Sequence, residues 1–295
     1  MIIKAMKVTV INPHGFCAGV QKALDHAYKA KKEHPTQPIY ILGNLVHNER
    51  VIGDLVKDGF IILDERKKSL SEWIDTLKKD DIIVFSAHGH DPHLDEKAAS
   101  KGLVCYDATC PFVKANSTLI KRRIMQGGEV IFIGQAGHAE TEGTLKIDPS
   151  KVFLFEPKKS FDFDQVSAKN PLLVSQTTMG TEEMKDSVSL LKDHFPEIDV
   201  AARVCDATDK RQSAICTAPE DIDLYVVMGS KTSNNTMKLL ELATAKYPKA
   251  VVVRCLDVED LKTTLAKPFK HAALISGAST GLREFEEVKD YLENL

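Results

Sequence analysis

The chain has 295 residues, and its 39 basic and 42 acidic side chains give a formal net charge of −3 at pH 7. This balance excludes a nucleic-acid-binding protein that works through a broad basic face, and the length suits two or three domains. No apolar stretch approaches the roughly 20 residues that a membrane-spanning helix requires. Lys4 and Lys7 interrupt the opening segment too early for a signal peptide, so we expect a cytoplasmic protein.

Strand and helix patterns alternate along the chain. A β-branched strand is expected at 7–11, followed by a helix at 18–34 where apolar residues recur at helical spacing. Short buried strands are expected at 82–85, 172–174 and 272–275, and amphipathic helices at 182–194, 236–247 and 283–295. The irregular stretch 157–171 has the composition of a surface connection. This alternation predicts an α/β fold with mainly parallel sheets.

The most informative feature is a repeat. Cys17, Cys110 and Cys205 are 93 and 95 residues apart. An apolar run ending in glycine follows each cysteine after 26, 24 and 24 residues, and a run ending in serine follows after 69, 65 and 71. These landmarks are Gly43, Gly134 and Gly229, and Ser86, Ser175 and Ser276. Unrelated loops would not keep this register, so we predict three similar α/β domains in a pseudo-threefold arrangement around a shared centre.

The predicted domains are 18–109, 110–203, and 1–17 together with 204–295. In open α/β units, ligands bind beyond the carboxyl ends of the strands. The cysteine, glycine and serine landmarks all fall at such ends. We therefore expect these turns to converge on one cavity.

Each repeated cysteine follows an extended segment and begins a helix, where the helix dipole lowers the pKa of a thiol and favours metal ligation. Three such thiolates could bind zinc with an open fourth position or an iron–sulfur cluster with one unprotected iron. Burial as small hydrophobic residues would not explain their common register. The remaining cysteines lack that register and are interpreted as buried small residues: Cys105, Cys216 and Cys255.

Hydrogen-bond donors gather at the same turns. His47 and His138 each follow a landmark glycine by four residues, Ser233 has that offset in the third repeat, and His88 lies just past its strand. Neutral or switchable donors at strand ends and helix starts suit a small phosphorylated ligand. The histidines without this context are interpreted as structural or surface residues: His14, His26, His34, His194 and His271.

Glu140 is the acid that we single out, because it lies at a strand-end turn beside the expected cavity. A carboxylic acid held protonated there could deliver a proton. Glu142 has an equal claim on sequence alone. Thr177 could orient such an acid by hydrogen bonding, or it could be an ordinary turn residue.

Taken together, these motifs resemble the IspH/LytB family of 4-hydroxy-3-methylbut-2-enyl diphosphate reductases nearly from end to end. The matching segments lie at 12–20, 46–48, 85–89, 107–111, 137–140, 176–178, 205–208 with 211–212, 229–231 and 277–280. The sequence departs from the family's usual pattern at a few positions, of which Asn234 matters most because it borders the expected diphosphate site. The other departures are Ala139, Lys210 and Gly281.

The resemblance implies a 4Fe–4S cluster held by Cys17, Cys110 and Cys205, with the fourth iron open to the substrate hydroxyl. It implies that Glu140, assisted by Thr177, supplies the proton that lets water leave. The residues that it implies for diphosphate binding are His47, His88, His138, Ser233, Asn234, Asn235 and Ser279.

The implied reaction gives isopentenyl and dimethylallyl diphosphate, the last step of the methylerythritol phosphate route to isoprenoids. The implied electron donor is ferredoxin or flavodoxin. Two alternatives stay open for a diverged relative: a non-redox, metal-dependent lyase and an iron–sulfur sensor. Dependence on a reductant separates the reductase from the lyase, and the presence of Glu140 argues against a sensor because sensing needs no proton donor.

Overall fold

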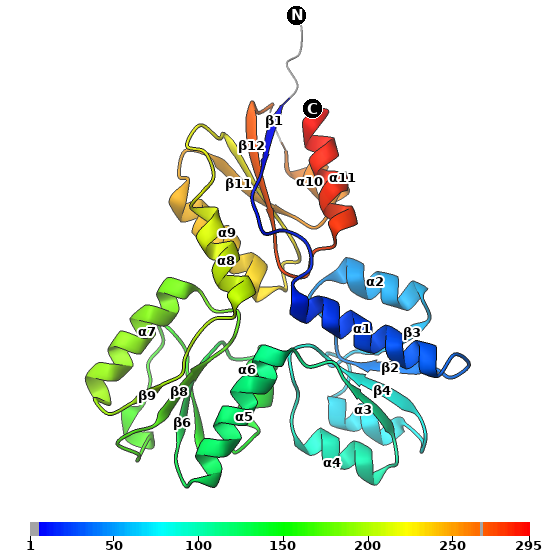
Figure 1. Ribbon diagram of the computed structural model, residues 1–295, viewed down its shortest axis with the longest axis vertical. Coiled ribbons are helices and arrows are strands. Elements are labelled where there is room, and N and C mark those ends of the chain that lie inside the picture. The colour runs from blue at the N-terminus through cyan, green and yellow to red at the C-terminus, as the bar shows by residue number, and fades with distance from the viewer. Residues whose placement is uncertain (1–5, 266–267) are drawn as a thin grey trace, which may run out of the picture. The chain divides into compact units, whose positions relative to one another are not determined.

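The computed structural model describes residues 6–265 and 268–295, in which strands and helices alternate as the sequence predicts (Figure 1). These residues form three four-stranded sheets, and every strand pairs in parallel with its neighbours. Because parallel sheets carry helices on their faces, their strands are buried and apolar. The α/β class with parallel sheets is therefore confirmed.

Sheet B has the strand order β3-β2-β4-β5 and contains the second to fifth strands of the chain. Its strands are β2 (Ile39–Leu42), β3 (Phe60–Leu63), β4 (Ile82–Phe85) and β5 (Val104–Asp107). The helices in this part of the chain are α1 (Ala18–Glu33), α2 (Glu49–Lys57), α3 (Leu70–Thr76) and α4 (His93–Ser100).

Sheet C has the order β7-β6-β8-β9. Its strands are β6 (Val130–Ile133), β7 (Val152–Phe155), β8 (Leu172–Ser175) and β9 (Asp199–Val200). The helices here are α5 (Pro111–Met125), α6 (Ala139–Leu145) and α7 (Thr181–His194). The expected irregular connection at 157–171 contains one short 3-10 helix, η1 (Phe163–Gln165).

Sheet A has the order β1-β12-β10-β11 and joins the start of the chain to its end. Its strands are β1 (Lys7–Val10), β10 (Leu224–Met228), β11 (Val251–Cys255) and β12 (His271–Ser276). The helices here are α8 (Asp206–Ile215), α9 (Asn234–Lys246), α10 (Val258–Thr264) and α11 (Leu282–Glu293).

The three sheets share one topology. Read from its other edge, sheet A has the order β11-β10-β12-β1, which matches β3-β2-β4-β5 and β7-β6-β8-β9 strand for strand. The first strand of the chain thus takes the place that β5 and β9 fill in the other sheets. The strands of each sheet fall within one predicted domain range. The domain boundaries and the threefold arrangement stay predictions.

One landmark of the predicted repeat is wrong by a residue. Ser175 and Ser276 end β8 and β12, but β4 ends at Phe85, and Ser86 lies one position beyond it. The strand pairing shows that Phe85 is the true equivalent of the two serines. Phe85 pairs with the last residue of β2, just as Ser175 pairs with the last residue of β6 and Ser276 with the last residue of β10. A serine happens to follow Phe85, which produced the false match.

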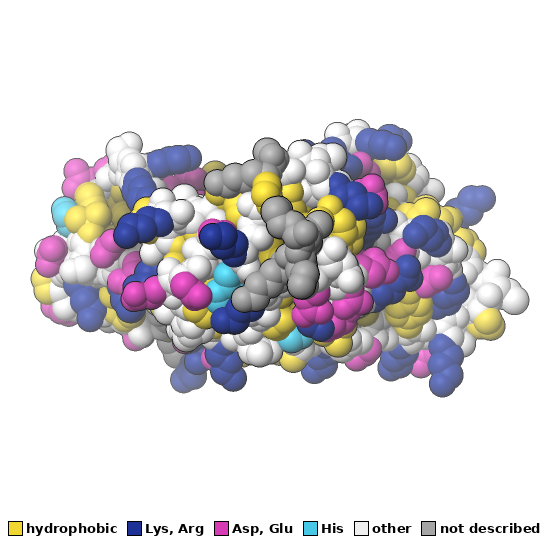
Figure 2. All heavy atoms as spheres, turned by 90° about the horizontal axis from the view of Figure 1, so that it is seen from above, with side chains coloured by type: hydrophobic (Ala, Val, Ile, Leu, Met, Phe, Trp, Pro, Cys, Tyr) yellow, Lys and Arg dark blue, Asp and Glu magenta, His cyan; other side chains and the backbone are white. Residues whose placement is uncertain are grey.

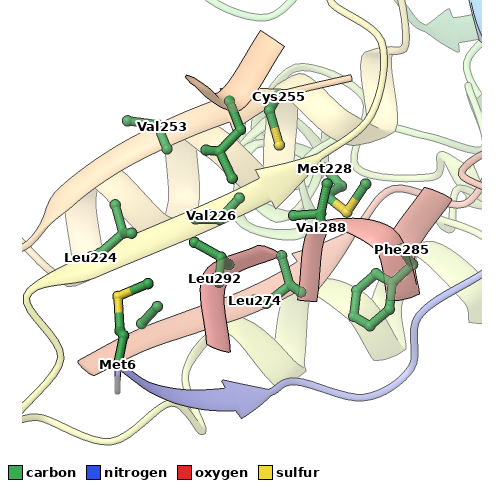
Figure 3. Packing of buried hydrophobic residues seen from close by; sticks show 12 residues of the cluster. Met6, Leu224, Val226, Met228, Val253, Cys255, Leu274, Phe285, Val288 and Leu292 are labelled. Atoms are coloured by element: carbon green, nitrogen blue, oxygen red, sulfur yellow. The ribbon is translucent and has the colours of Figure 1, made fainter. Parts of the chain in front are cut away.

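Helices cover both faces of sheet A. On one face, Val226, Leu274 and Phe285 belong to a buried cluster that joins the sheet to α10 and α11 (Figure 3). On the other face, Ile215 of α8 and Leu239 of α9 pack in a second cluster on the same strands. In sheet C, α5 and α7 likewise contribute to separate clusters on the two faces. Close packing on both faces keeps the ends of the strands in fixed positions.

The chain forms two compact units. The first contains sheet A and consists of the described residues of Met1–Val20, His47–Gly53 and Asp206–Leu295, and the second contains sheets B and C in Gln21–Val46 and Asp54–Cys205. On the face shown in Figure 2, basic and acidic side chains are interspersed. In the part of the chain that the structure describes, no helix is both long enough and apolar enough to cross a bilayer.

Candidate active site

The landmark glycines have the same hydrogen bond in all three sheets. Each landmark glycine directly follows a central strand. Its backbone N–H donates to the last carbonyl of the neighbouring strand, at 3.0 Å for Gly43, 3.1 Å for Gly134 and 2.8 Å for Gly229. The chain therefore leaves each sheet along the same path. The next loop starts from an equivalent place in each sheet, as the sequence register predicts.

The three cysteines are also equivalent. α1, α5 and α8 each begin at the residue directly after Cys17, Cys110 and Cys205, respectively. The backbone N–H of each cysteine donates to the carbonyl two residues beyond the end of β12, β4 and β8, respectively, at distances of 2.9, 2.9 and 3.0 Å. All three side chains are partly buried. The sequence predicted that each cysteine begins a helix, but not these backbone bonds.

The donor set suits an iron–sulfur cluster. Thiolates are the usual protein ligands of such clusters, and hydrogen bonds to the sulfurs tune them. The N–H of Val20 lies 3.4 Å from the sulfur of Cys17 and donates to it. Among the residues that the structure describes, no group of three or more histidine, cysteine or acidic side chains could hold a single metal ion. Cluster thiolates bind separate iron atoms, so they need not meet at one point.

The remaining cysteines differ from one another. Cys255 is fully buried in sheet A, and burial raises the pKa of its thiol to about 12, as expected for an inert core residue. Cys105 and Cys216 are exposed, so their interpretation as buried small residues is wrong. The sequence was misleading there because cysteine is among the residue types that are most often buried.

Glu140 lies in the first turn of α6 and is 3% exposed. The Thr177 hydroxyl donates to Oε2 of Glu140 at 2.8 Å, and the Thr177 N–H lies 3.0 Å from Oε1. Burial raises the pKa of Glu140 to about 7, while the hydrogen bonds from Thr177 act in the opposite direction. The predicted contact between these two residues is present. Burial therefore favours the neutral form of this carboxyl.

Glu142, which the sequence could not separate from Glu140, has a different place. Its side chain is exposed, and Oε1 accepts the N–H of Gly137 at 2.8 Å. Glu142 therefore braces the turn before α6, while Glu140 lies in the interior. Of the two glutamates, only Glu140 is buried, and its role as the acid stays a prediction.

Gln176 fixes the turn that carries Glu140, and sequence reasoning quoted it only as part of a motif. Its side chain is fully buried, and its carbonyl oxygen accepts the Thr141 hydroxyl and the Gln135 N–H, both at 3.1 Å. These bonds tie the start of α6 to the end of β8. They hold Glu140 over Thr177.

His88 and His138 come together at the ends of sheets B and C, within one compact unit. Their rings meet edge to face with centroids 6.0 Å apart. Gly143 permits this approach, because a Cβ there would lie 3.1 Å from the backbone of His90. His138 also caps α6, since its Nδ1 accepts the N–H of Glu140 at 3.2 Å. The two predicted donors thus form one pair beside the acid.

The first turn of α9 carries a second group of predicted donors. Ser233 caps this helix and accepts the N–H of Thr236 at 3.3 Å, and Asn234 is its first residue. Asn235 is 3% exposed, and neither its amide nitrogen nor its oxygen has a partner among the described residues. A buried amide without a partner costs free energy unless a ligand satisfies it.

Close packing holds this turn against sheet A. A Cβ on Gly229 or Gly277 would lie 2.3 or 2.2 Å from the Thr236 hydroxyl oxygen. Only glycine leaves room for that side chain over the ends of β10 and β12. The start of α9, with Asn235, is therefore fixed at the carboxyl edge of the sheet.

His47 and Ser279 meet in the same compact unit. The Ser279 hydroxyl donates to the His47 carbonyl at 3.1 Å, and the Asn48 amide donates to the Ser279 carbonyl at 2.7 Å. Burial lowers the pKa of His47, while Glu49 raises it. The net lowering of the pKa of His47 favours its neutral imidazole. The sequence did not single out Asn48, although it lies in the family-matching segment 46–48. Its amide holds the Ser279 loop in place.

A family model described as "LytB protein" matches residues 8–293. The 4-hydroxy-3-methylbut-2-enyl diphosphate reductase of Geobacillus sp. (strain WCH70) is 34% identical over 291 residues, which cover 98% of this chain and 90% of that protein. The reductase of the same name from Macrococcus caseolyticus (strain JCSC5402) is 34% identical over 292 residues, with coverage of 98% and 89%.

A solved structure is also similar across the chain. The E-1-hydroxy-2-methyl-but-2-enyl-4-diphosphate reductase from Plasmodium falciparum superposes with a TM-score of 0.86 at 29% identity, covering 98% of this chain and 89% of that one. The family model, the curated relatives and this fold all match nearly the whole chain. The chain therefore belongs to the LytB family.

Proposed function

We propose that this protein is a 4-hydroxy-3-methylbut-2-enyl diphosphate reductase. It would remove the substrate's allylic hydroxyl as water, taking up two electrons and two protons, and release isopentenyl and dimethylallyl diphosphate. Relatives named for this activity match almost the entire chain. The single observation that carries the proposal is Glu140, a fully buried carboxyl whose pKa is about 7, held by Thr177 at a strand-end turn.

Cys17, Cys110 and Cys205 would hold a 4Fe–4S cluster with one iron open. When bound, such a cluster supplies a Lewis-acid iron for the hydroxyl oxygen and a route for electrons. The equivalent attachment of the three cysteines to strand ends supports this ligand set. The backbone N–H that Val20 directs at the Cys17 sulfur supports it as well.

Glu140 would deliver the proton that lets the hydroxyl leave as water. Both carboxyl oxygens accept hydrogen bonds from Thr177, which would hold the acid in one orientation for proton transfer. General acids work best when their pKa lies near the working pH, and a pKa of about 7 meets that condition. Gln176 would keep the acid in place through its bonds to Thr141 and the turn before α6.

Neutral donors would hold the diphosphate. Hydrogen bonds to a charged acceptor are stronger than those between neutral groups. The unsatisfied amide of Asn235 supports this role for the first turn of α9. The full proposed set comprises His47, His88, His138, Ser233, Asn234, Asn235 and Ser279.

The proposal places the protein at the last step of the methylerythritol phosphate pathway, in the cytoplasm, with ferredoxin or flavodoxin as electron donor. The lyase alternative needs no electrons, and a sensor needs no acid. Reductant dependence therefore separates these functions most simply.

The test is an anaerobic assay of the purified protein with the hydroxylated allylic diphosphate, run with and without a chemical reductant such as dithionite with methyl viologen. We expect both isoprenoid diphosphates to form only when the reductant is present. Loss of water without electron uptake would replace the reductase with a lyase. Substrate binding without any product would favour a sensor.

A further inference from the structure

Two strand-end serines hold the loops that carry cysteines. The hydroxyl of Ser276, at the end of β12, accepts the N–H of Gly15 at 2.9 Å. The hydroxyl of Ser175, at the end of β8, donates to the carbonyl of Arg203 at 3.0 Å. Gly15 and Arg203 each lie two residues before a cysteine, Cys17 and Cys205. In both repeats, the last residue of the strand thus holds the residue that lies two positions before the cysteine.

A second side chain then holds each serine from the other direction. Nε of Arg211 in α8 donates to the Ser276 carbonyl at 3.2 Å, and the amide of Asn116 in α5 donates to the Ser175 carbonyl at 2.9 Å. Both side chains are buried. Each also stands six residues after a cysteine, so these contacts occupy equivalent places in the repeat.

Arg211 reaches further than Asn116. One of its terminal nitrogens donates to the Gly15 carbonyl at 2.7 Å, and the other donates to the Ala207 carbonyl at 3.2 Å. Gly15 is therefore held at its N–H by Ser276 and at its carbonyl by Arg211. Its backbone φ is +78°, in the left-handed region that favours glycine.

The third repeat has different residues at these two positions. Phe85 ends β4, where the other sheets have a serine, and Ala23 stands six residues after Cys17. Neither side chain can form a hydrogen bond. Side-chain braces of this kind therefore support the loops of Cys17 and Cys205 but have no counterpart at these positions for Cys110.

We propose that Arg211 and Asn116 are positioning residues for the cysteine ligands. Arg211 holds the loop of Cys17, and Asn116, acting through Ser175, holds the segment of Cys205. In both cases, the helix that follows one cysteine braces the loop of the next. The inference rests on the proposed function in one respect: the thiols matter because they bind the cluster.

The experiment measures which thiol is released first when the cluster is lost. Anaerobically purified protein with its native cluster is mixed with an iron chelator and iodoacetamide, and mass spectrometry follows the labelling rate of each cysteine. Arg211→Met and Asn116→Leu remove the two braces with little change in volume. Arg123→Met is the matched control, because Arg123 also donates to a backbone carbonyl, that of Asn170, which lies two residues before β8 begins rather than at its end.

Arg211→Met should raise the labelling rate of Cys17 about tenfold relative to Cys110 and Cys205, which corresponds to about 1.4 kcal/mol of local opening free energy. Asn116→Leu should do the same for Cys205 alone. Arg123→Met should leave the ratios among the three cysteines unchanged. A general loss of stability would raise all three rates together, and that result, or no change in the ratios, would overturn the proposal.

Two further variants guard against misfolding. Arg211→Lys keeps the charge but loses the planar fork of donors that reaches three carbonyls, so its effect should be intermediate. Ser276→Ala removes the bond to Gly15 without leaving a buried charge unpaired. It should also raise the labelling rate of Cys17 relative to the other two cysteines. If the wild-type protein carries neither iron nor sulfide, the proposed function fails. The labelling ratios of the same variants, measured without chelator, then still decide the role of the braces.

Discussion

Sheets A and C have the same strand order, but their carboxyl ends carry different functional side chains. Sheet C presents a buried acid, Glu140, whose oxygens are both engaged by Thr177. Sheet A presents Asn235, a buried amide without a partner in the described chain, on a helix capped by Ser233. The shared topology provides a fixed edge in each case. Under the proposed function, the residues on that edge decide whether it delivers a proton or binds the diphosphate.

The two ends also differ in how burial acts. In sheet C, burial stabilises the neutral form of an acid and brings its pKa into the physiological range. In sheet A, burial leaves the Asn235 amide without a partner among the described residues. Removing the acid should therefore act on turnover, and removing the amide should act on affinity. The predictions below test that division.

The largest expected effect is on turnover at the sheet C end. Glu140→Gln keeps the size of the side chain but cannot give up a proton. We expect kcat to fall about 10³-fold with little change in KM, as for the loss of a general acid. Anaerobic steady-state kinetics measure both constants. Glu142→Gln is the control and should keep full activity, and an equal loss in both variants would refute the assignment of the acid.

The next effect concerns stability. The pKa of Glu140 is about 7 in the folded protein and 4.5 as its ordinary value, so the unfolded state loses this proton first. The stabilising contribution of the neutral acid is complete below pH 4.5 and is lost as pH rises through 7. Between pH 5 and 8, wild type should lose about 2 kcal/mol relative to Glu140→Gln. Urea unfolding at several pH values measures this difference, and parallel curves would show that Glu140 ionises normally.

At the sheet A end, Asn235→Leu should raise KM about 30-fold and change kcat little. Hydrogen bonds to charged groups contribute about 1.5–3 kcal/mol, which sets this range. The same variant should be slightly more stable without substrate, because it removes an unsatisfied amide. Asn294→Leu, at the exposed end of α11, is the control and should not alter KM. A fall in kcat alone would break the proposed division between the two ends.

The smallest effect is expected for Thr177→Val, about tenfold in kcat. The Thr177 hydroxyl lowers the pKa of Glu140, so its loss should raise that pKa further. The alkaline limb of the pH–rate profile should therefore move to higher pH. Thr177→Ser should restore both the rate and the profile. A limb that moves to lower pH would contradict the geometry of this pair.

Much of the fold could be predicted because its signals are local. Buried strands such as 82–85 and helices such as that beginning at Ala18 follow from apolar runs and helical spacing. The register of Cys17, Cys110 and Cys205 correctly predicted equivalent helix starts. Ser86 failed as a landmark because strand ends depend on pairing, which a residue pattern does not contain.

The finer features of the site depend on tertiary packing. Glu140 and Glu142 look alike in sequence, but only one of them faces the interior. Asn48 and Gln176 act through bonds to residues that are distant in the chain, Ser279 and Thr141. No local pattern marks such a contact. The motifs that contain these residues pointed to the correct loops without giving their roles.

The most direct test of the central claim is iron and sulfide analysis of anaerobically reconstituted protein, with Mössbauer spectra recorded with and without the hydroxylated allylic diphosphate. The account predicts about four irons and four sulfides per chain, with one distinct iron site that changes when this ligand binds. One tightly bound zinc without sulfide, or a cluster whose spectrum ignores the ligand, would contradict it.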